Sequence, residues 1–474
     1  MKKPKKPDQN NIIHCVESIY LTNKIVHTNP ANSCKIVIID TNNGTILSNN
    51  HKKTIINKSL DRREILRQIS HDENISTSTY REGLILLPPG CTYTHDTHDN
   101  SSNIKISLCN QVNYHPGKAD DPFEILVSHI AAEYRNNNCG KLVVRFSGGV
   151  DSTCLLLAAI EVAGASRVTA LTWFADDCSS NNDRIAATSL CKTLNIKHML
   201  FRFEPRYLFQ DIDPDNHYFV NLGMASDQVF EKEGDFISSH LDEDYIILDG
   251  HGGDHVFLDP VPSQAFRDLF KRKNIINGLK IAVKISKLTG SSIYETLSSN
   301  RKQRNHQYNQ RNDFLNIQVP PLLNIGRPEN LRDVHLQATM QAMAQNATST
   351  TLNKTTKIAY PFTSKEMVEF ALNQNPYNMF NEFATRLPLR YATNKKYPTI
   401  PLRSDKGHIT SAYQRALKHH KERILNKLTK SWLTKDNLIN MSHVENAISR
   451  SALGIGGVDP ILLKIICASL IKGL

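Results

Sequence analysis

Two short glycine-rich segments contain the residues best suited to chemistry, RFSGGVDST at 145–153 and YIILDGHGGDHVF at 245–257. In the first, Ser147, Gly148 and Gly149 allow a tight turn whose amide hydrogens can point at an anion. The helix that follows would add its partial positive charge. The segment lacks the GxxxxGK sequence of a Walker A loop. It therefore predicts a phosphate-binding loop of another kind.

Each segment also supplies a carboxylate for a metal ion. Asp151 is the acidic residue of the first loop, and Asp254 stands in the second among Gly250, Gly252 and Gly253. These glycines permit a close backbone approach at the end of a strand. Magnesium prefers a few carboxylates together with phosphate oxygens. We therefore expect Asp151 and Asp254 to bind Mg²⁺ jointly.

The elements that must position these residues alternate between strands and helices from Pro122 onward. Apolar strand-like runs (KLVVRF, RVTALTWF, KHMLFRFE, DYIILDG) alternate with helical patterns such as TCLLLAAIEVAG. This alternation predicts an α/β fold with a parallel sheet and ligand sites at the carboxyl ends of its strands. Residues 296–312 have almost no apolar side chains and are expected to form a mobile loop. From about Leu331 the pattern is mainly helical.

The residues before about Asp120 show a different sequence pattern. Short β-like runs at 34–40, 83–90 and 104–110 are separated by polar clusters, which is typical of a small, mostly β module. We expect two domains, 1–118 and 119–474, with the glycine-rich segments in the second.

Composition excludes several classes of protein. The 474 residues are 40% hydrophobic and 22% charged, as in ordinary folded proteins. No apolar stretch is long enough for a membrane span, no signal peptide is evident, and the nine cysteines never form a CxxC pair. We expect a cytoplasmic protein without membrane contact and with reduced cysteines.

The net charge of +11 admits an anionic ligand without identifying it. Between Lys395 and Lys435 there are eleven basic and two acidic residues. This stretch could hold pyrophosphate, steer an acidic substrate, or simply form a solvated helix face.

The SGGVDS loop resembles the pyrophosphate loop of the N-type ATP pyrophosphatases. With the second segment and three C-terminal stretches, 358–372, 386–392 and 401–417, the chain resembles the asparagine synthetase superfamily. The resemblance implies ATP and Mg²⁺ as cofactors, an ATP-pyrophosphatase fold, and release of AMP and pyrophosphate. It implies that Lys406 neutralises phosphate charge and that Ser152 helps to bind the nucleotide. Arg403 could assist in nucleotide binding or could be a surface residue.

Within that superfamily, GHGGDH at 250–255 most resembles the second motif of the lasso-peptide macrolactam cyclases. His251 and His255 stand where asparagine synthetases carry glutamates, and they could act in catalysis or only donate hydrogen bonds. The N-terminal module resembles a shortened glutaminase-like domain without the catalytic cysteine at position 2. An internal source of ammonia is therefore not expected, so the amine must arrive with the substrate.

The resemblance implies a specific reaction. ATP would adenylate an Asp or Glu side chain of a precursor peptide, and the peptide's N-terminal amine would displace AMP to close a macrolactam. It also implies a leader-binding protein and a leader peptidase as partners. The alternatives are asparagine or β-lactam synthesis on a small molecule, tRNA modification, or a non-catalytic scaffold. Without a CxxC pair or a recognisable RNA-binding module, we expect no nucleic-acid partner.

Overall fold

The computed structural model describes most of the chain from Asp121 to the C-terminus and part of the region before it. The described residues are 19–21, 25–27, 36–41, 44–48, 59–70, 80–87, 91–96, 103–108, 121–175, 180–214, 227–262, 264–298, 313–317, 319, 323–324, 328–348, 357–403 and 410–474.

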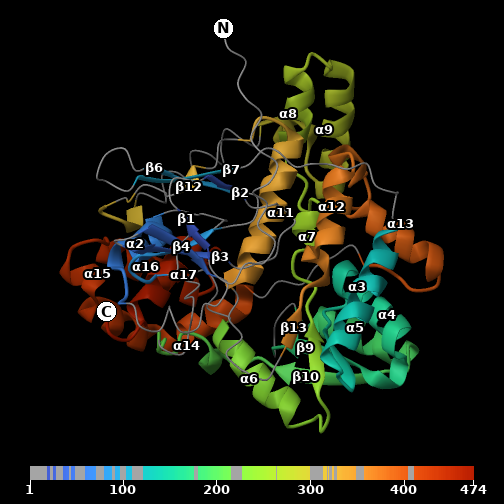
Figure 1. Cartoon of the computed structure of the whole chain (residues 1–474), viewed down its shortest axis with the longest axis horizontal. Coiled ribbons are helices and arrows are strands. Elements are labelled where there is room, and N and C mark those ends of the chain that lie inside the picture. The colour runs from blue at the N-terminus through green and yellow to red at the C-terminus, as the bar shows by residue number, and fades with distance from the viewer. Residues whose placement is uncertain are drawn as a thin grey trace.

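The centre of the molecule is a five-stranded parallel sheet with the order β10-β9-β8-β11-β13 (Figure 1). Its strands are β8 (Lys141–Arg145), β9 (Val168–Phe174), β10 (Lys197–Arg202), β11 (Tyr245–Leu248) and β13 (Lys357–Ala359). The β8 and β11 strands, which precede the two glycine-rich segments, are direct neighbours, with Val143 opposite Ile247. The predicted α/β fold with a parallel sheet is confirmed.

Alternate side chains of the central strands enter two separate hydrophobic cores. Leu142 and Val144 of β8 face one core, while Val143 of the same strand faces the other. This period of two places apolar residues on both sides of the sheet, as expected for a parallel sheet covered by helices. The fully buried strands explain why the sequence shows continuous apolar runs there rather than alternation.

Helices cover both faces of the sheet. The core with Leu142 includes side chains from α3 (Pro122–Asn137), α4 (Val150–Ala163), α5 (Ser180–Thr193), α7 (Gly253–Val256), α8 (Gln264–Lys271), α9 (Ile275–Thr289), α11 (Leu331–Thr348), α12 (Lys365–Asn373) and α13 (Leu387–Lys396). The core with Val143 includes α2 (Arg62–Ser70), α6 (Asp227–Ser238), α14 (Thr410–Lys430), α15 (Trp432–Lys435), α16 (Met441–Ala452) and α17 (Pro460–Ser469). The predicted helical C-terminal part is therefore confirmed, and α11 begins at Leu331.

The N-terminal region contains two further sheets. One has the order β1-β4-β3-β5, with β1 (Ile19–Leu21), β3 (Ile36–Thr41), β4 (Gly44–Ser48) and β5 (Leu84–Leu87). The other has the order β12-β7-β6-β2, with β2 (Ile25–His27), β6 (Cys91–Asp96), β7 (Asn103–Leu108) and β12 (Leu323–Asn324). The predicted β runs are present, together with helix α2. Because β12 pairs with β7, a late segment completes an N-terminal sheet. The division at residue 118 remains a prediction.

Side chains also join the N-terminal region to the rest of the protein. The buried Lys464 of α17 donates to the carbonyl of Gln68 in α2 at 3.1 Å. Arg81 donates to the carbonyl of Pro214 at 2.6 Å. The two predicted domains are therefore packed against each other rather than joined by a linker alone.

The predicted loop at 296–312 overlaps a helix at its start. Residues 293–298 are helical, and Thr296 is buried, with its hydroxyl donating to the Ser292 carbonyl at 3.0 Å. Residues 299–312 lie outside the described residues. The polar composition at 296–298 reflects an amphipathic helix end rather than a loop.

The basic C-terminal stretch is partly engaged in ion pairs. Lys396 contacts Glu124 and Glu161, while Arg423 and Lys427 both contact Asp211. These pairs support a structural role for several of the charges. The described free cysteines, Cys139, Cys154, Cys191 and Cys467, are all buried, as expected for packing residues. Among the described helices, none has the length and hydropathy that would let it cross a bilayer.

Candidate active site

A cavity of about 300 Å³ lies where β8 and β11 end. Both glycine-rich segments reach it, together with two arginines from the C-terminal part. Its lining comprises Arg145, Ser147, Gly149, Val150, Asp151, Ser152, Asp249, Gly250, His251, Asp254, Asp259, Arg386 and Arg403. The carboxyl ends of neighbouring parallel strands meet at one edge, which is the usual place for a ligand in such a sheet.

The first loop is held in shape by its own serines. The Ser152 hydroxyl donates to the Gly149 carbonyl at 3.1 Å, and the Ser147 amide donates to the Ser152 hydroxyl at 3.3 Å. Gly148 has a φ of +76°, which L side chains rarely adopt. Gly149 is the N-cap of α4 and has no side chain to cap it. The first turn of α4 therefore lines the cavity with a helix N-terminus, a geometry suited to an anion.

The second segment packs directly on the first. A Cβ atom on Gly253 would lie 2.7 Å from Asp151 Cγ, closer than real Cβ atoms come. Gly252 has a φ of +93°, and a Cβ there would lie 2.5 Å from Thr363 Cγ2. Both glycines are therefore required by close approach, and Gly253 sets the distance between the two motifs.

This packing predicts the effect of one added methyl group. We expect Gly253→Ala to displace Asp151 and slow ATP cleavage by roughly tenfold to a hundredfold, since small shifts of reacting groups are costly. Gly253 starts α7 with an ordinary backbone conformation, so the effect would be steric. Gly457→Ala is the matched control, because nothing lies within 4 Å of its Cβ position. Equal AMP-release rates for the two variants would contradict this account.

Arg145, the last residue of β8, links the first glycine-rich segment to the second through ion pairs. Its guanidinium pairs with Glu233 of α6 and, at 2.6 Å, with Asp249 at the end of β11. Asp249 in turn accepts from the His251 amide at 2.7 Å. Burial would raise the pKa of Asp249, but Arg145 and His251 outweigh it and hold that pKa below its ordinary value. Asp249 is therefore a carboxylate that fixes the second turn.

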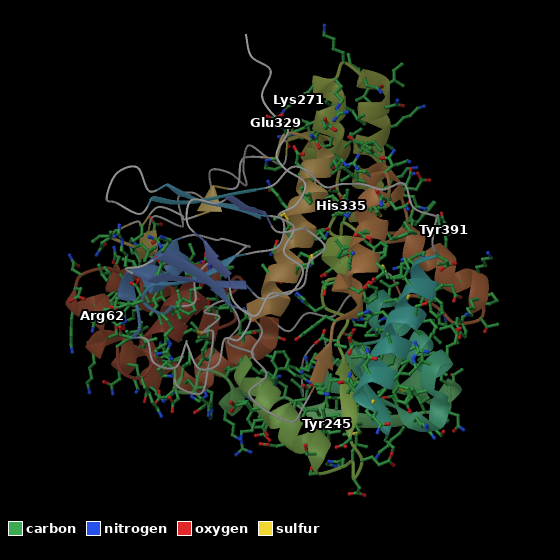
Figure 2. The ribbon with its side chains drawn as sticks, in the orientation of Figure 1. Arg62, Tyr245, Lys271, Glu329, His335 and Tyr391 are labelled. Atoms are coloured by element: carbon green, nitrogen blue, oxygen red, sulfur yellow. The ribbon has the colours of Figure 1, made fainter. Side chains whose placement is uncertain are left out.

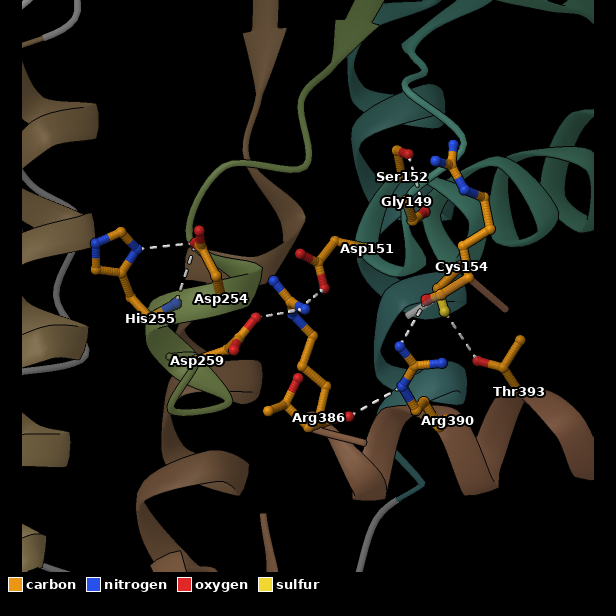
Figure 3. Close-up of polar contacts among 12 residues, drawn as sticks. Gly149, Asp151, Ser152, Cys154, Asp254, His255, Asp259, Arg386, Arg390 and Thr393 are labelled. Atoms are coloured by element: carbon orange, nitrogen blue, oxygen red, sulfur yellow. Dashed lines mark hydrogen bonds and ion pairs between the residues drawn. The ribbon is translucent and has the colours of Figure 1, made fainter. Parts of the chain in front are cut away.

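Arg386 performs a similar bridging role on the other side of the cavity. It is a buried residue that caps α13 with a left-handed backbone, at φ 57°. Its Nε lies 2.9 Å from Asp151 Oδ1, and its Nη1 lies 2.7 Å from Asp259 Oδ2. Figure 3 shows Arg386 between these two carboxylates, with Asp254 close by. The arginine therefore orients Asp151 toward the cavity and offsets part of its charge.

Arg390, one turn later in α13, holds the segment that leads to Lys406. It donates to the carbonyls of Leu402 and Arg403 at 2.9 and 2.7 Å. Arg403 lines the cavity, and its Nη1 pairs with Asp183 Oδ1 at 2.9 Å. Lys406 itself lies outside the described residues, and its proposed role remains a prediction.

The two histidines have different surroundings. The Nδ1–H of His255 donates to Asp254 Oδ1 at 2.9 Å, so the carboxylate orients its ring (Figure 3). His251 is 5.9 Å from His255 between ring centroids, and it lies edge-on to Tyr360. Burial lowers the pKa of His251 below its ordinary value despite the nearby Asp249. The His251 imidazole is therefore neutral at neutral pH.

Asp151 and Asp254 fit a magnesium ion that is shared with a nucleotide. Both line the same cavity, beside a glycine-rich helix terminus suited to phosphate. The described residues contain no cluster of three or more His, Cys, Asp or Glu side chains arranged for a metal. Two carboxylates supplemented by phosphate oxygens are a common arrangement for magnesium. Metal binding here remains a prediction that this donor set supports.

Cys154 is not a nucleophile in this site, although it lies one turn beyond the first loop. It is fully buried, and burial raises the pKa of its thiol to about 12. Its sulfur lies 3.1 Å from the Thr393 hydroxyl (Figure 3). The thiol therefore joins α4 to α13 and stays protonated.

Most of the residues expected from the sequence lie at or against this cavity. Gly148, Gly253 and His255 do not line it but contact residues that do, whereas Gly252 packs on Thr363 and Ala342. The lining residues that sequence reasoning missed are Arg145, Val150, Asp249, Asp259 and Arg386. Arg145 and Asp249 immediately precede the two turns, and Arg386 begins the RLPLRYA stretch, so their positions offered a signal. Asp259 offered none.

Comparison with known proteins places the chain in a family. The family described as asparagine synthase matches residues 135–456. The microcin J25-processing protein McjC of Escherichia coli is 24% identical over 314 residues, which are 64% of this chain and 55% of that protein. The chain thus matches about half the length of that curated relative.

Two solved structures are also similar in part. NMN synthetase from Francisella tularensis is 19% identical, covering 30% of this chain and 58% of that chain with a TM-score of 0.23. The ammonia-dependent NAD synthetase from Campylobacter jejuni is 13% identical, covering 43% of this chain and 99% of that chain, also with a TM-score of 0.23.

The family match covers the parallel sheet, both glycine-rich segments and the arginines that hold them. It confirms the resemblance to the asparagine synthetase superfamily that was inferred from the sequence. The chain belongs to the asparagine synthase family.

Proposed function

We propose that this protein is an ATP-dependent carbon–nitrogen ligase that forms an amide bond and releases AMP and pyrophosphate. The observation that carries the proposal is the convergence of Asp151 and Asp254 on one cavity beside the SGGVDS helix terminus. Membership of the asparagine synthase family supports the same chemistry. A scaffold without activity would not require the buried Arg386 pair that holds Asp151 in place.

The chain's own residues would perform three tasks in the first step. The loop at Ser147–Gly149 and the start of α4 would bind the phosphates, with Arg403 beside them. Magnesium, when bound by Asp151 and Asp254, would offset negative charge on the phosphates. Lys406 would supply a further positive charge where the pyrophosphate leaves. The carboxylate substrate would then carry AMP as a good leaving group.

In the second step the site must accept a neutral amine and exclude water. We propose His251 as the group that takes the amine proton, because its neutral imidazole lines the cavity. His255 lies outside the lining and would position Asp254, which accepts from its Nδ1–H. An α-amine with a pKa near 8 is already partly unprotonated at neutral pH.

We propose a precursor peptide as the substrate, with an Asp or Glu side chain adenylated and the N-terminal amine closing a lasso macrolactam. The histidine form of the second motif and the similarity to a microcin-processing protein support this choice. A leader-binding protein and a leader peptidase would then act with it. The main alternative is a ligase of the same family acting on a small molecule.

Mass spectrometry of a candidate leader-free peptide, incubated with the protein and MgATP, tests the proposal. We expect the peptide to lose one water while AMP and pyrophosphate appear together. AMP formation with only aspartate and ammonia would instead indicate asparagine synthesis. If neither substrate yields AMP, the ligase proposal is wrong.

A further inference from the structure

Helices α8 and α9 form a hairpin that projects from the body of the molecule (Figure 1). Their inner faces are tightly packed, since a Cβ on Gly278 would lie 2.4 Å from the Phe270 ring. The rings of Phe266 and Phe270 are in edge-to-face contact. Ile281 and Ile285 belong to the hydrophobic core that contains Leu142. The hairpin is therefore a rigid part of the fold, and its outer side chains are not needed to hold it together.

The outer face of this hairpin is unusually apolar. Ile275 and Ile276, just past the turn, are 61% and 71% exposed. Leu279 and Val283 follow at helical spacing and are 45% and 39% exposed. Beyond the end of α9, Tyr294 is 78% exposed. A contiguous group of exposed apolar side chains of this kind marks an interaction surface.

The same face is strongly basic. Residues 264–298 contain seven Lys or Arg and two acidic residues. Of the acidic pair, Asp268 is buried against Arg272 and Tyr377, and Glu295 accepts from Ser292.

Five lysines are left to form a basic border around the apolar residues. Within the described part of the chain none of them has an ion-pair partner, and Figure 2 shows Lys271 near the end of the hairpin. They are Lys271, Lys273, Lys280, Lys284 and Lys287. The complementary surface must therefore be anionic and must also accept aliphatic side chains.

We propose that this hairpin docks the protein on an anionic lipid membrane, with Ile275 and Ile276 inserted at the tip. The lysines would lie among the phosphate headgroups. The long stem of each lysine can lie along the apolar surface while its ammonium remains at the headgroups. This contact lies on the surface of the bilayer and differs from the sequence-based expectation of no membrane contact. It is independent of the proposed ligase activity.

Co-sedimentation of the full chain with lipid vesicles tests the proposal. We expect binding to phosphatidylcholine–phosphatidylglycerol vesicles, little binding to phosphatidylcholine alone, and release by salt. The double variant Ile275→Asn/Ile276→Asn should bind at least about tenfold more weakly, as should the triple variant Lys271→Gln/Lys273→Gln/Lys280→Gln.

Matched controls separate the hairpin from general surface properties. Leu453→Asn/Ile455→Asn removes two other exposed apolar residues, and Lys192→Gln/Lys365→Gln/Lys472→Gln removes three exposed lysines elsewhere. Both should bind like the wild type. Equal losses in control and hairpin variants would overturn the proposal. The proposal would also be overturned if the wild-type protein did not bind anionic vesicles but bound a poly-glutamate peptide. That result would indicate that the hairpin contacts an acidic protein partner.

Discussion

Asp151→Asn is expected to lower the rate of ATP cleavage about a hundredfold or more in a protein that still folds, and Asp254→Asn should do the same. Losing one well-placed electrostatic group in an active site typically has this effect. Both carboxylates line the cavity, and an amide is a poorer ligand for magnesium. Pyrophosphate release measured over a range of magnesium concentrations would show the loss. Wild-type turnover in either variant would remove that carboxylate from the site.

A control is needed because Asp151 also pairs with Arg386. Asp259→Asn removes the other carboxylate of the same arginine and leaves both proposed metal ligands in place. We expect this variant to lose less activity than Asp151→Asn and to show an unchanged magnesium requirement. Equal losses, without any change in magnesium dependence, would mean that Asp151 serves mainly to hold Arg386.

Arg145→Met is expected to reduce the free energy of unfolding by about 3–5 kcal/mol, the usual cost of removing one partner of a buried ion pair. Glu233 has a fully buried side chain, and its carboxylate would lose the paired guanidinium. Asp249 would lose its contact at 2.6 Å as well. Urea unfolding followed by intrinsic fluorescence measures the change. Identical midpoints for variant and wild type would show that this network adds no stability.

The double variant Arg145→Met/Glu233→Gln provides the matched test. The introduced glutamine side chain would carry no charge and could still accept from the Trp173 indole, which donates to Glu233 at 2.6 Å in the wild-type protein. We expect the double variant to be more stable than Arg145→Met alone. A further loss on adding Glu233→Gln would show that the cost does not arise from an unpaired buried carboxylate.

The same network has a pH dependence of defined sign. The pKa of Asp249 is lower in the folded protein than its ordinary value, because Arg145 and His251 outweigh the effect of burial. The stability this provides is present above the ordinary aspartate pKa and is lost as the pH falls through the lowered one. Acid unfolding of Arg145→Met should therefore lack that contribution.

Local patterns in the chain were sufficient for four of the five strands of the parallel sheet and for the two turns, whereas β13 was not predicted. The strands β8 and β11 are short apolar runs that each precede a glycine-rich segment, so 145–153 and 245–257 could be assigned to strand ends. Gly148 and Gly252 also indicate tight turns, and in the structure both have a positive φ. These features depend on residues that are close in sequence, so they could be predicted without knowing the tertiary structure.

Tertiary structure alone decided which charges meet at the cavity. Arg386 lies 235 positions beyond Asp151 in the chain, yet it pairs with it and with Asp259. No spacing rule predicts such a contact, because it depends on how α13 packs against α3 and α4. The basic stretch shows the same limit, since the sequence did not predict that Arg423 and Lys427 pair with Asp211. The sequence by itself determined the resemblance to the family, four strands of the sheet and the two glycine-rich turns, because these rest on local sequence patterns. Only the tertiary structure decided which residues pair with each buried charge. A buried charge is costly unless an opposite charge lies beside it, and the packing of distant elements determines which residues become neighbours.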